Sequence, residues 1–160
     1  MYLNKSVLFI FGTGGHHAQA NRLSKILLPE LEGVDVVTLS DFNDKPTWSD
    51  RHYCCGELRK KNSHSQIFSN FGPITIIMKL IEIKKKNKII ALISTGPGIS
   101  ILGALYLKLF GVKIIHIETW SRFETKSLTG RIMYLLSDRF YVQNRSLQKH
   151  YPKSIYSGKL

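Results

Sequence analysis

Short apolar runs that end at glycine or at turn residues recur along this chain. The first, from Val7 to Phe11, is β-branched and aromatic and is followed at once by glycines. A run without polar alternation is typical of a parallel strand that is buried on both faces. The pattern therefore predicts a central strand at residues 7–11, with helices on each side of its sheet.

Helical periodicity follows this strand, because Ala20, Leu23, Leu27 and Leu28 share one face of a helix predicted from residue 16 to 28. The same alternation of strand and helix returns later in the chain. Strands are predicted at residues 35–39, 89–93, 112–117 and 140–142, a helix at 99–110 and a helical turn at 146–150. Such alternation implies an α/β fold, a Rossmann-like doubly wound parallel sheet that forms one domain over residues 1–160. Residues 40–66 are the least predictable part.

The glycine turn after the first strand is a predicted anion site. The sequence Gly12-Thr13-Gly14-Gly15-His16 lies between a buried strand and a helix start, where backbone N–H groups and the helix dipole attract a phosphate. Position 17 is histidine, so the turn is not the G-x-G-x-x-G fingerprint of dinucleotide-binding proteins. A tight structural turn without a ligand remains the alternative.

A second turn of the same kind, Ser94-Thr95-Gly96-Pro97-Gly98, follows another apolar strand and precedes a helix. Two such turns at the carboxyl edge of one sheet can flank a single cleft, where open α/β sheets bind their ligands. Two phosphates or a pyrophosphate would suit this arrangement. The predicted acceptor and pyrophosphate contacts in the two turns are Gly12, Thr13, Gly14, Gly15, Thr95, Gly96 and Gly98.

Polar side chains at the same edge are predicted to carry the chemistry. His16 opens the first helix and could act as a general base, and Glu118 directly follows the strand at 112–117. Arg122, Ser127 and Thr129 come next and are predicted acceptor contacts, although capping of a helix through Met133, Leu135 and Leu136 is a sufficient explanation for Ser127.

The charge of the chain favours a polyanionic partner, since 23 Lys and Arg against 11 Asp and Glu give a net charge of +12. The excess is concentrated in residues 51–90. There, an apolar stretch precedes a lysine run, which is typical of an interfacial helix on anionic lipid but also of a core helix with a solvated end. The predicted membrane-facing residues are Phe68, Phe71, Ile74, Ile77, Lys84, Lys85 and Lys86. Nucleic-acid binding is disfavoured, because the lysines do not interleave with aromatics.

The remaining sequence features concern membrane attachment, disulfides and cofactors. Neither a signal peptide nor a span of about 20 apolar residues is predicted, so we expect membrane contact to be peripheral, at the cytoplasmic face. The two cysteines, Cys54 and Cys55, are neighbours and are expected to stay reduced. No Asp-x-Asp sequence or cluster of metal ligands occurs, and no cofactor is predicted.

The ordered series of motifs resembles a known family. It consists of the turns at 12–16 and 96–98, then His116 to Arg122, Ser127 to Arg131, Ser137 to Gln143 and Tyr151 to Gly158. In these segments the chain resembles the PssD-type exopolysaccharide and capsule glycosyltransferase subunits. Those are similar to the membrane subunit of the eukaryotic two-part enzyme that adds the second GlcNAc to dolichol pyrophosphate-GlcNAc, and more distantly to the N-terminal half of MurG.

The resemblance implies the acceptor-side half of a GT-B glycosyltransferase that has been divided into two chains. A separate partner subunit would bind the UDP-sugar, while this chain would bind a polyprenyl-pyrophosphate-linked sugar; transfer would invert the anomeric centre without a required metal. His16 matches the turn histidine that is taken as base or acceptor contact, and Glu118 matches the acidic residue after the fifth strand. A scaffold that recruits a catalytic partner to the membrane, without supplying a reacting group, remains the alternative function.

Overall fold

The computed structural model describes residues 4–55 and 72–160 and consists of alternating strands and helices. In chain order the elements are β1 (Lys5–Ile10), α1 (Gly15–Leu27), η1 (Leu28–Glu30), β2 (Asp35–Ser40), β3 (Arg51–Cys54), α2 (Gly72–Lys86), β4 (Lys88–Ser94), α3 (Ile99–Lys108), β5 (Lys113–Ile117), α4 (Leu128–Leu136), β6 (Arg139–Val142), η2 (Arg145–Lys149) and β7 (Ile155–Tyr156). α and β denote α-helices and strands, and η denotes short 3₁₀ helices.

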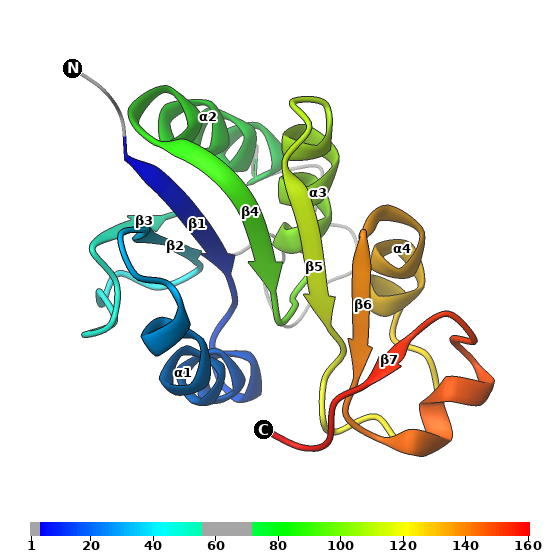
Figure 1. Cartoon of the computed structure of the whole chain (residues 1–160). Helices are drawn as coiled ribbons and strands as arrows, with labels where there is room; N and C mark the ends of the chain where they lie inside the picture. The colour runs from blue at the N-terminus through cyan, green and yellow to red at the C-terminus, as the bar shows by residue number, and fades with distance from the viewer. Residues whose placement is uncertain (1–3, 56–71) are drawn as a thin grey trace.

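The strands form one parallel sheet in the order β3-β2-β1-β4-β5-β6-β7. β1 lies inside this sheet, where Leu8 pairs with Val37 of β2 on one side and with Leu92 of β4 on the other. The chain therefore winds outward from β1 to β3 and then, after crossing back, from β4 to β7 (Figure 1). The predicted Rossmann-like doubly wound fold is confirmed, and the point where the direction of winding reverses lies between β1 and β4.

Helices cover both faces of the sheet, but unequally. α2, α3 and α4 lie side by side behind it, whereas α1 lies in front (Figure 1). Side chains along β1 alternate between these layers: Leu8 and Ile10 belong to the core beneath α2–α4, while Val7 and Phe9 belong to the core beneath α1. The continuous apolar run in β1 is thus explained by burial on both faces.

Most predicted elements occur within two residues of the expected bounds, but β3 and β7 were not predicted. The apolar stretch before the lysine run forms α2, in which Pro73 is part of the helix. Among the described residues, Cys54 and Cys55 form no disulfide, and burial raises the pKa of the Cys55 thiol to about 12.

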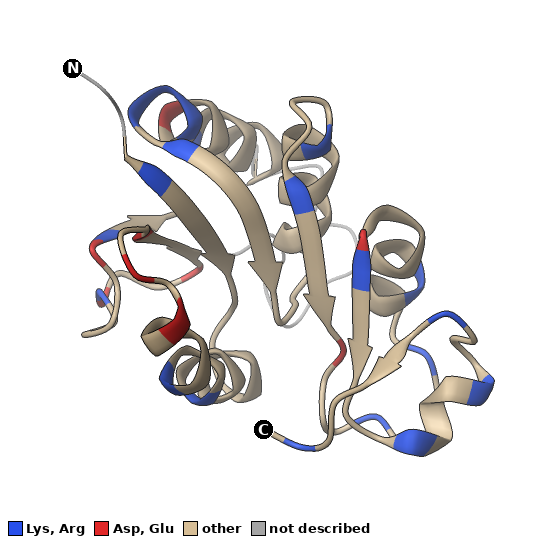
Figure 2. Cartoon of the chain, in the orientation of Figure 1, with Lys and Arg blue, Asp and Glu red and all other residues tan. Residues whose placement is uncertain are grey.

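The lysine run at the end of α2 lies at the amino-terminal edge of the sheet. α2 has 15 residues, or about 22 Å of helix, and its last turn leads directly into the start of β4. Basic side chains also begin β1, β4 and β5, so this edge is strongly positive (Figure 2). The glycine turns lie at the opposite, carboxyl-terminal edge.

Close packing of α3 on the sheet gives a stability test. A Cβ atom on Gly103 would lie 2.4 Å from Cδ1 of the buried Ile10. We expect Gly103→Ala to lower the free energy of unfolding by about 1–3 kcal/mol, as overpacked core substitutions do. In an Ile10→Val background, which lacks Cδ1, the same alanine should cost close to nothing. Urea denaturation of the four proteins in this double-mutant cycle measures the coupling; an equal cost in both backgrounds would contradict the predicted contact.

Candidate functional site

The two predicted turns lie side by side at the carboxyl edge of the sheet. β1 and β4 are neighbours, and Ile10 at the end of one pairs with Ser94 at the end of the other. Thr95 N–H donates to the Ile10 carbonyl at 3.3 Å, which joins the two chains just past the strands. The two turns are therefore neighbours in the fold, while a ligand cleft that both of them flank stays a prediction.

The turns pack without space for side chains between them. A Cβ on Gly12 would meet Cγ and Cδ of Pro97 at 2.8 and 2.9 Å. A Cβ on Gly96 would meet Cε1 of His16 at 2.6 Å, and Gly96 has a positive φ of 90°. Glycine is thus required at positions 12 and 96 by close approach, and at 96 also by its backbone conformation.

His16 bridges the two turns. Its Nδ1 lies 2.6 Å from the Thr95 carbonyl oxygen, and Thr95 Oγ1 donates back to the His16 carbonyl at 3.1 Å. A carbonyl oxygen only accepts, so Nδ1 carries the hydrogen. In the neutral ring, Nε2 is then the unprotonated nitrogen, which can accept a proton or a hydrogen bond.

Backbone donors differ between the two turns. In the first, the helical bonds begin with Ala18 N–H donating to Gly14, so the N–H groups of Gly15, His16 and His17 lie ahead of the helical ladder. In the second, Gly96 N–H already donates to Ser94 Oγ at 3.1 Å. The first turn is therefore the better-equipped anion site, while a role of Gly96 and Gly98 in binding pyrophosphate stays a prediction.

Glu118 is 2% exposed and its carboxylate is held inside the protein. It accepts hydrogen bonds at 3.1 Å from Ser127 Oγ and from the Tyr151 hydroxyl, and at 3.0 Å from Thr119 N–H. Ser127 also caps α4 by accepting from Gly130 N–H at 2.7 Å, which confirms the predicted cap. Burial and the nearby Glu118 carboxylate raise the pKa of Tyr151. The observed contacts give Glu118 a structural task, and its catalytic role stays a prediction.

The other two predicted residues of this region are Arg122, in the segment between β5 and α4, and Thr129, in α4. Arg122 is exposed and donates to Thr125 Oγ1 at 3.1 Å. Asn144 Nδ2 donates to the backbone carbonyl of Trp120 at 2.9 Å, which ties the loop to the segment after β6. Thr129 is half-buried in the first turn of α4. Contacts of Arg122 and Thr129 with an acceptor stay predictions.

A buried histidine that the sequence did not single out supports the second turn. His116 in β5 is 1% exposed, and its Nδ1 lies 3.0 Å from the same Ser94 hydroxyl that receives Gly96 N–H. Burial, and to a smaller extent the charge of His16, lower the pKa of His116 to about 3. His116 is therefore a neutral structural group beneath the turn.

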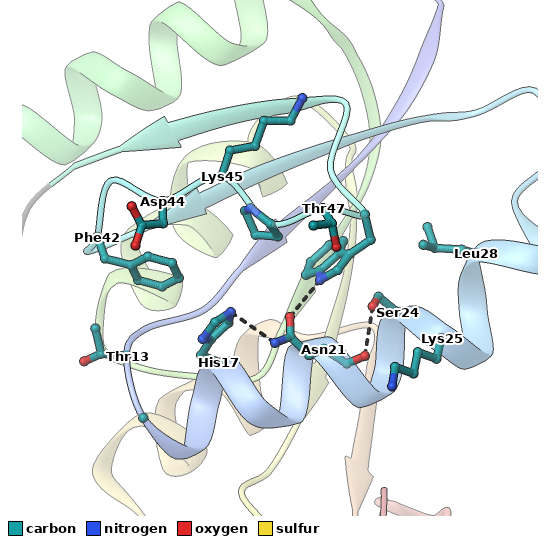
Figure 3. A pocket seen from close by; sticks show the side chains of 13 residues that line it. Thr13, His17, Asn21, Ser24, Lys25, Leu28, Phe42, Asp44, Lys45 and Thr47 are labelled. Carbon is teal, nitrogen blue, oxygen red and sulfur yellow. Dashed lines mark hydrogen bonds between the residues drawn. The ribbon is translucent and has the colours of Figure 1, made fainter.

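A pocket of about 740 Å³ adjoins the first turn on the side away from β4. It lies between α1 and the segment that joins β2 to β3, and Figure 3 shows side chains from both converging on it. Its lining residues are Thr13, Gly14, His17, Asn21, Ser24, Lys25, Leu28, Phe42, Asp44, Lys45, Pro46, Thr47 and Trp48. Only Thr13 and Gly14 of these were predicted; the spacing of His17 and Asn21, one helical turn apart, was the available signal.

The predicted membrane-facing residues are only partly described. Phe68 and Phe71 lie outside the described residues. Ile74 is 56% exposed, whereas Ile77 is partly buried and packs against the core beneath α2; contact of α2 with a membrane stays a prediction. Lys84 places its ammonium 4.0 Å from the Phe110 ring centroid, and Lys85 and Lys86 are exposed. In the part of the chain that the structure describes, no helix is long and apolar enough to span a membrane, and no His, Cys, Asp or Glu cluster could hold a metal.

The fold and the paired turns define a Rossmann-like domain of the GT-B type. Two solved structures share this architecture: *Acinetobacter baumannii* MurG, with a TM-score of 0.65 and 16% identity, and UDP-GlcNAc 2-epimerase from *Methanocaldococcus jannaschii*, with a TM-score of 0.68 and 10% identity. The chain is covered to 98% and 96% in these matches, but spans only 44% and 45% of those proteins. At such identity the similarity shows the fold alone.

Sequence similarity identifies the family. Residues 53–160 match the family described as oligosaccharide biosynthesis protein Alg14 like. The UDP-N-acetylglucosamine transferase subunit ALG14 of *Mus musculus* is 35% identical over 181 residues, and that of *Rattus norvegicus* 28% over 180; each match covers 96% of this chain and 82% of the relative. The chain belongs to the Alg14-like family.

The buried His116 predicts a pH dependence of stability. Its pKa is about 3 in the folded protein and about 6.5 when exposed, so below pH 6.5 the unfolded chain binds the extra proton. The contribution of the neutral His116 ring to the free energy of unfolding is therefore complete above pH 6.5 and is lost as the pH falls toward 3. Between about pH 6 and pH 5 we expect a loss of about 1 kcal/mol per pH unit.

His116→Asn keeps a polar group for Ser94 but does not titrate, so its stability should fall less steeply over the same range. Urea denaturation of both proteins as a function of pH measures the two slopes. Parallel slopes would contradict the assignment of a depressed pKa to His116.

Proposed function

We propose that this chain is the acceptor-binding subunit of a two-component inverting glycosyltransferase. The partner subunit binds a UDP-sugar, and this chain binds a polyprenyl-pyrophosphate-linked sugar to which the donor sugar is transferred. The observation that carries the proposal is the contact between the two glycine turns, which we call the seam. There Thr95 fixes His16 next to the N-terminal N–H groups of α1. Membership of the Alg14-like family, whose mouse and rat members are named UDP-N-acetylglucosamine transferase subunits, supports it.

The proposed reaction divides between the chains. The acceptor pyrophosphate lies against the first turn, where the helix dipole and free N–H groups offset its negative charge. The acceptor hydroxyl attacks the anomeric carbon of the donor and its proton passes to His16 Nε2, because Nδ1 is held by the Thr95 carbonyl. The bond between the anomeric carbon and the donor phosphate breaks, and UDP leaves on the partner.

The domain and its setting form part of the same proposal. Residues 1–160 constitute the acceptor-side half of a GT-B enzyme; a match to only 44% of MurG agrees with one of two domains. The subunit works as a peripheral protein at the cytoplasmic face of the membrane, where a net charge of +12 favours anionic lipid. Its glycan is an exopolysaccharide or capsule, on the resemblance to PssD-type subunits.

A non-catalytic scaffold is the second candidate function, and Glu118 favours it. Each carboxylate oxygen accepts bonds from groups of this chain, and a Cβ on Gly130 would lie only 1.7 Å from Oε2. A carboxylate engaged in this way holds α4 and the segment around Tyr151 in place. Under the scaffold function the partner supplies the base, and the contacts of His16 with Thr95 only stabilise the fold.

Substitution of His16 separates the two functions. His16→Asn retains an amide N–H that can donate to the Thr95 carbonyl but has no nitrogen that accepts a proton. In the reconstituted two-subunit enzyme we expect kcat to fall by about 10²–10⁴-fold, the usual contribution of general acid–base catalysis. Assembly with the partner and thermal stability should remain close to wild type.

The matched control is His150→Asn, a histidine of the C-terminal segment outside both turns, which should retain kcat. An unchanged kcat in His16→Asn would show that His16 is not the general base, and the scaffold function would remain. Loss of assembly in that variant would instead show that the seam positions the partner.

A further inference from the structure

The helical layer behind the sheet exposes apolar side chains where a surface helix normally has polar ones. α2, α3 and α4 lie side by side in this layer (Figure 1). In α3, Ser100, Tyr106 and Lys108 are the polar residues, and the rest of the helix is apolar on every side. A helix that is apolar all round is normally buried. Leu105 on the outer side of α3 is nevertheless 48% exposed, and Leu109, which directly follows the helix, is 81% exposed.

The neighbouring helices continue this exposed apolar area. Leu128 and Leu135 of α4 are 75% and 80% exposed, and Met78 of α2 is 63% exposed. Contiguous apolar patches of this kind mark surfaces that contact another molecule or a membrane. We call the exposed apolar residues of this layer the apolar helical surface: Ile74, Met78, Leu105, Leu109, Phe110, Leu128 and Leu135.

The opposite face of the sheet provides the contrast. The exposed side chains of α1 include Arg22 and Lys25, and Ile26 is the large apolar side chain that this helix exposes. α1 is therefore amphipathic in the way expected of a helix that faces water. The apolar helical surface is thus a property of the α2–α4 layer and not of the whole chain.

The charges of the layer indicate what covers it. Within α2, α3 and α4, Glu82 is the one acidic residue, and it pairs with Lys79 at 2.9 Å and with Lys86 at 2.8 Å. Basic residues occur on all three helices (Figure 2): Lys79, Lys84, Lys85, Lys86, Lys108 and Arg131. Exposed leucines and phenylalanine among cations, with little negative charge, are complementary to anionic lipid.

The ends of the three helices are tied together around Phe110. Lys84 of α2 places its ammonium 4.0 Å from the Phe110 ring centroid, and Tyr106 packs against the same ring at 5.1 Å between centroids. Lys108 Nζ donates to the Leu136 carbonyl at the end of α4. Lysines that lie along an apolar surface in this way can keep their ammonium groups at the level of lipid phosphates while the apolar groups go deeper.

We propose that the apolar helical surface docks on an anionic lipid bilayer, with its leucines and Phe110 at the boundary of headgroups and acyl chains. The sheet then lies above the bilayer with one helix layer between them, about 10–12 Å thick. This orientation leaves the first turn, at the carboxyl edge, open to a lipid-linked pyrophosphate from the same membrane. The inference rests on the proposed peripheral setting of the subunit, to which it adds the face that makes contact.

Co-sedimentation of the full chain with vesicles tests this surface. We expect the wild type to bind equimolar phosphatidylglycerol–phosphatidylcholine vesicles at least about tenfold more tightly than phosphatidylcholine vesicles, because several lysines face the headgroups. Leu109→Glu and Leu135→Glu should each weaken binding to the mixed vesicles by about ten- to a hundredfold, since each removes an inserted leucine and adds a charge that the lipid repels. Both positions are exposed, so folding should be little affected.

Ile26→Glu is the matched control, because it makes the same kind of change at a 60% exposed apolar position of α1, on the other face of the sheet. It should keep the wild-type affinity for vesicles. A second measurement reports insertion directly: Leu109→Trp should gain fluorescence that brominated phosphatidylcholine quenches, relative to the wild type, whereas Ile26→Trp should not.

The outcomes separate the possible occupants. Vesicle binding that both leucine substitutions leave unchanged shows that another face contacts the membrane and overturns the proposal. Failure of the wild type to bind the mixed vesicles overturns it together with the proposed peripheral setting. A wild-type dimer that either substitution converts to a monomer in sedimentation equilibrium without lipid assigns the surface to a second copy of the chain instead.

The transfer function is tested independently of this surface. His16→Asn should bind the mixed vesicles as the wild type does, because His16 lies at the carboxyl edge and not on α2–α4. Normal vesicle binding with an unchanged kcat in that variant would contradict the proposed base and leave the docking surface intact.

Discussion

The contact between the β1–α1 and β4–α3 turns is the constraint on which the site depends. Parallel pairing of β1 with β4 ends both strands at the same level, and the turns then pack so closely that Gly12 faces the Pro97 ring and Gly96 faces the His16 imidazole. Thr95 contacts His16 twice, at its Nδ1 and at its backbone carbonyl. A side chain fixed by both its ring and its backbone has little freedom left to lose when a ligand arrives, which is what preorganised sites require.

The basic side chains of the amino edge lie far from this site. The lysines at the end of α2 and at the starts of β1, β4 and β5 lie at the amino edge, about 20 Å from the turns at 3.3 Å per strand residue. That separation is roughly twice the Debye length at physiological ionic strength. These lysines are therefore largely screened from the turns, so under the proposed function a pyrophosphate would depend on the local N–H groups and dipole of α1.

The sequence predicts this fold well where one strand is buried on both faces. Apolar runs identify β1, β2, β4 and β5, and glycines identify the two turns. β3 was not predicted, because Arg51 and His52 interrupt any apolar alternation. It is recognised only from its pairing with β2, in which Thr38 lies opposite His52 and the Thr38 hydroxyl lies 2.9 Å from that of Ser49. The pairing of His16 with Thr95 spans 79 residues and that of Glu118 with Tyr151 spans 33, so no local pattern shows which polar group is engaged within the protein.

The two adjacent histidines illustrate what the sequence leaves undetermined. Successive residues of an α-helix point about 100° apart, so His16 faces the β4 turn while His17 faces the segment after β2. The sequence favours His16, which opens the helix, but both histidines follow the same glycines and no local pattern shows which group each ring contacts. Tertiary contacts distinguish them: His16 Nδ1 meets a backbone carbonyl and leaves Nε2 unprotonated, whereas His17 Nε2 meets the Asn21 amide and leaves Nδ1 protonated. One turn of α1 thereby presents an acceptor nitrogen on one side of its N–H groups and a donor nitrogen on the other.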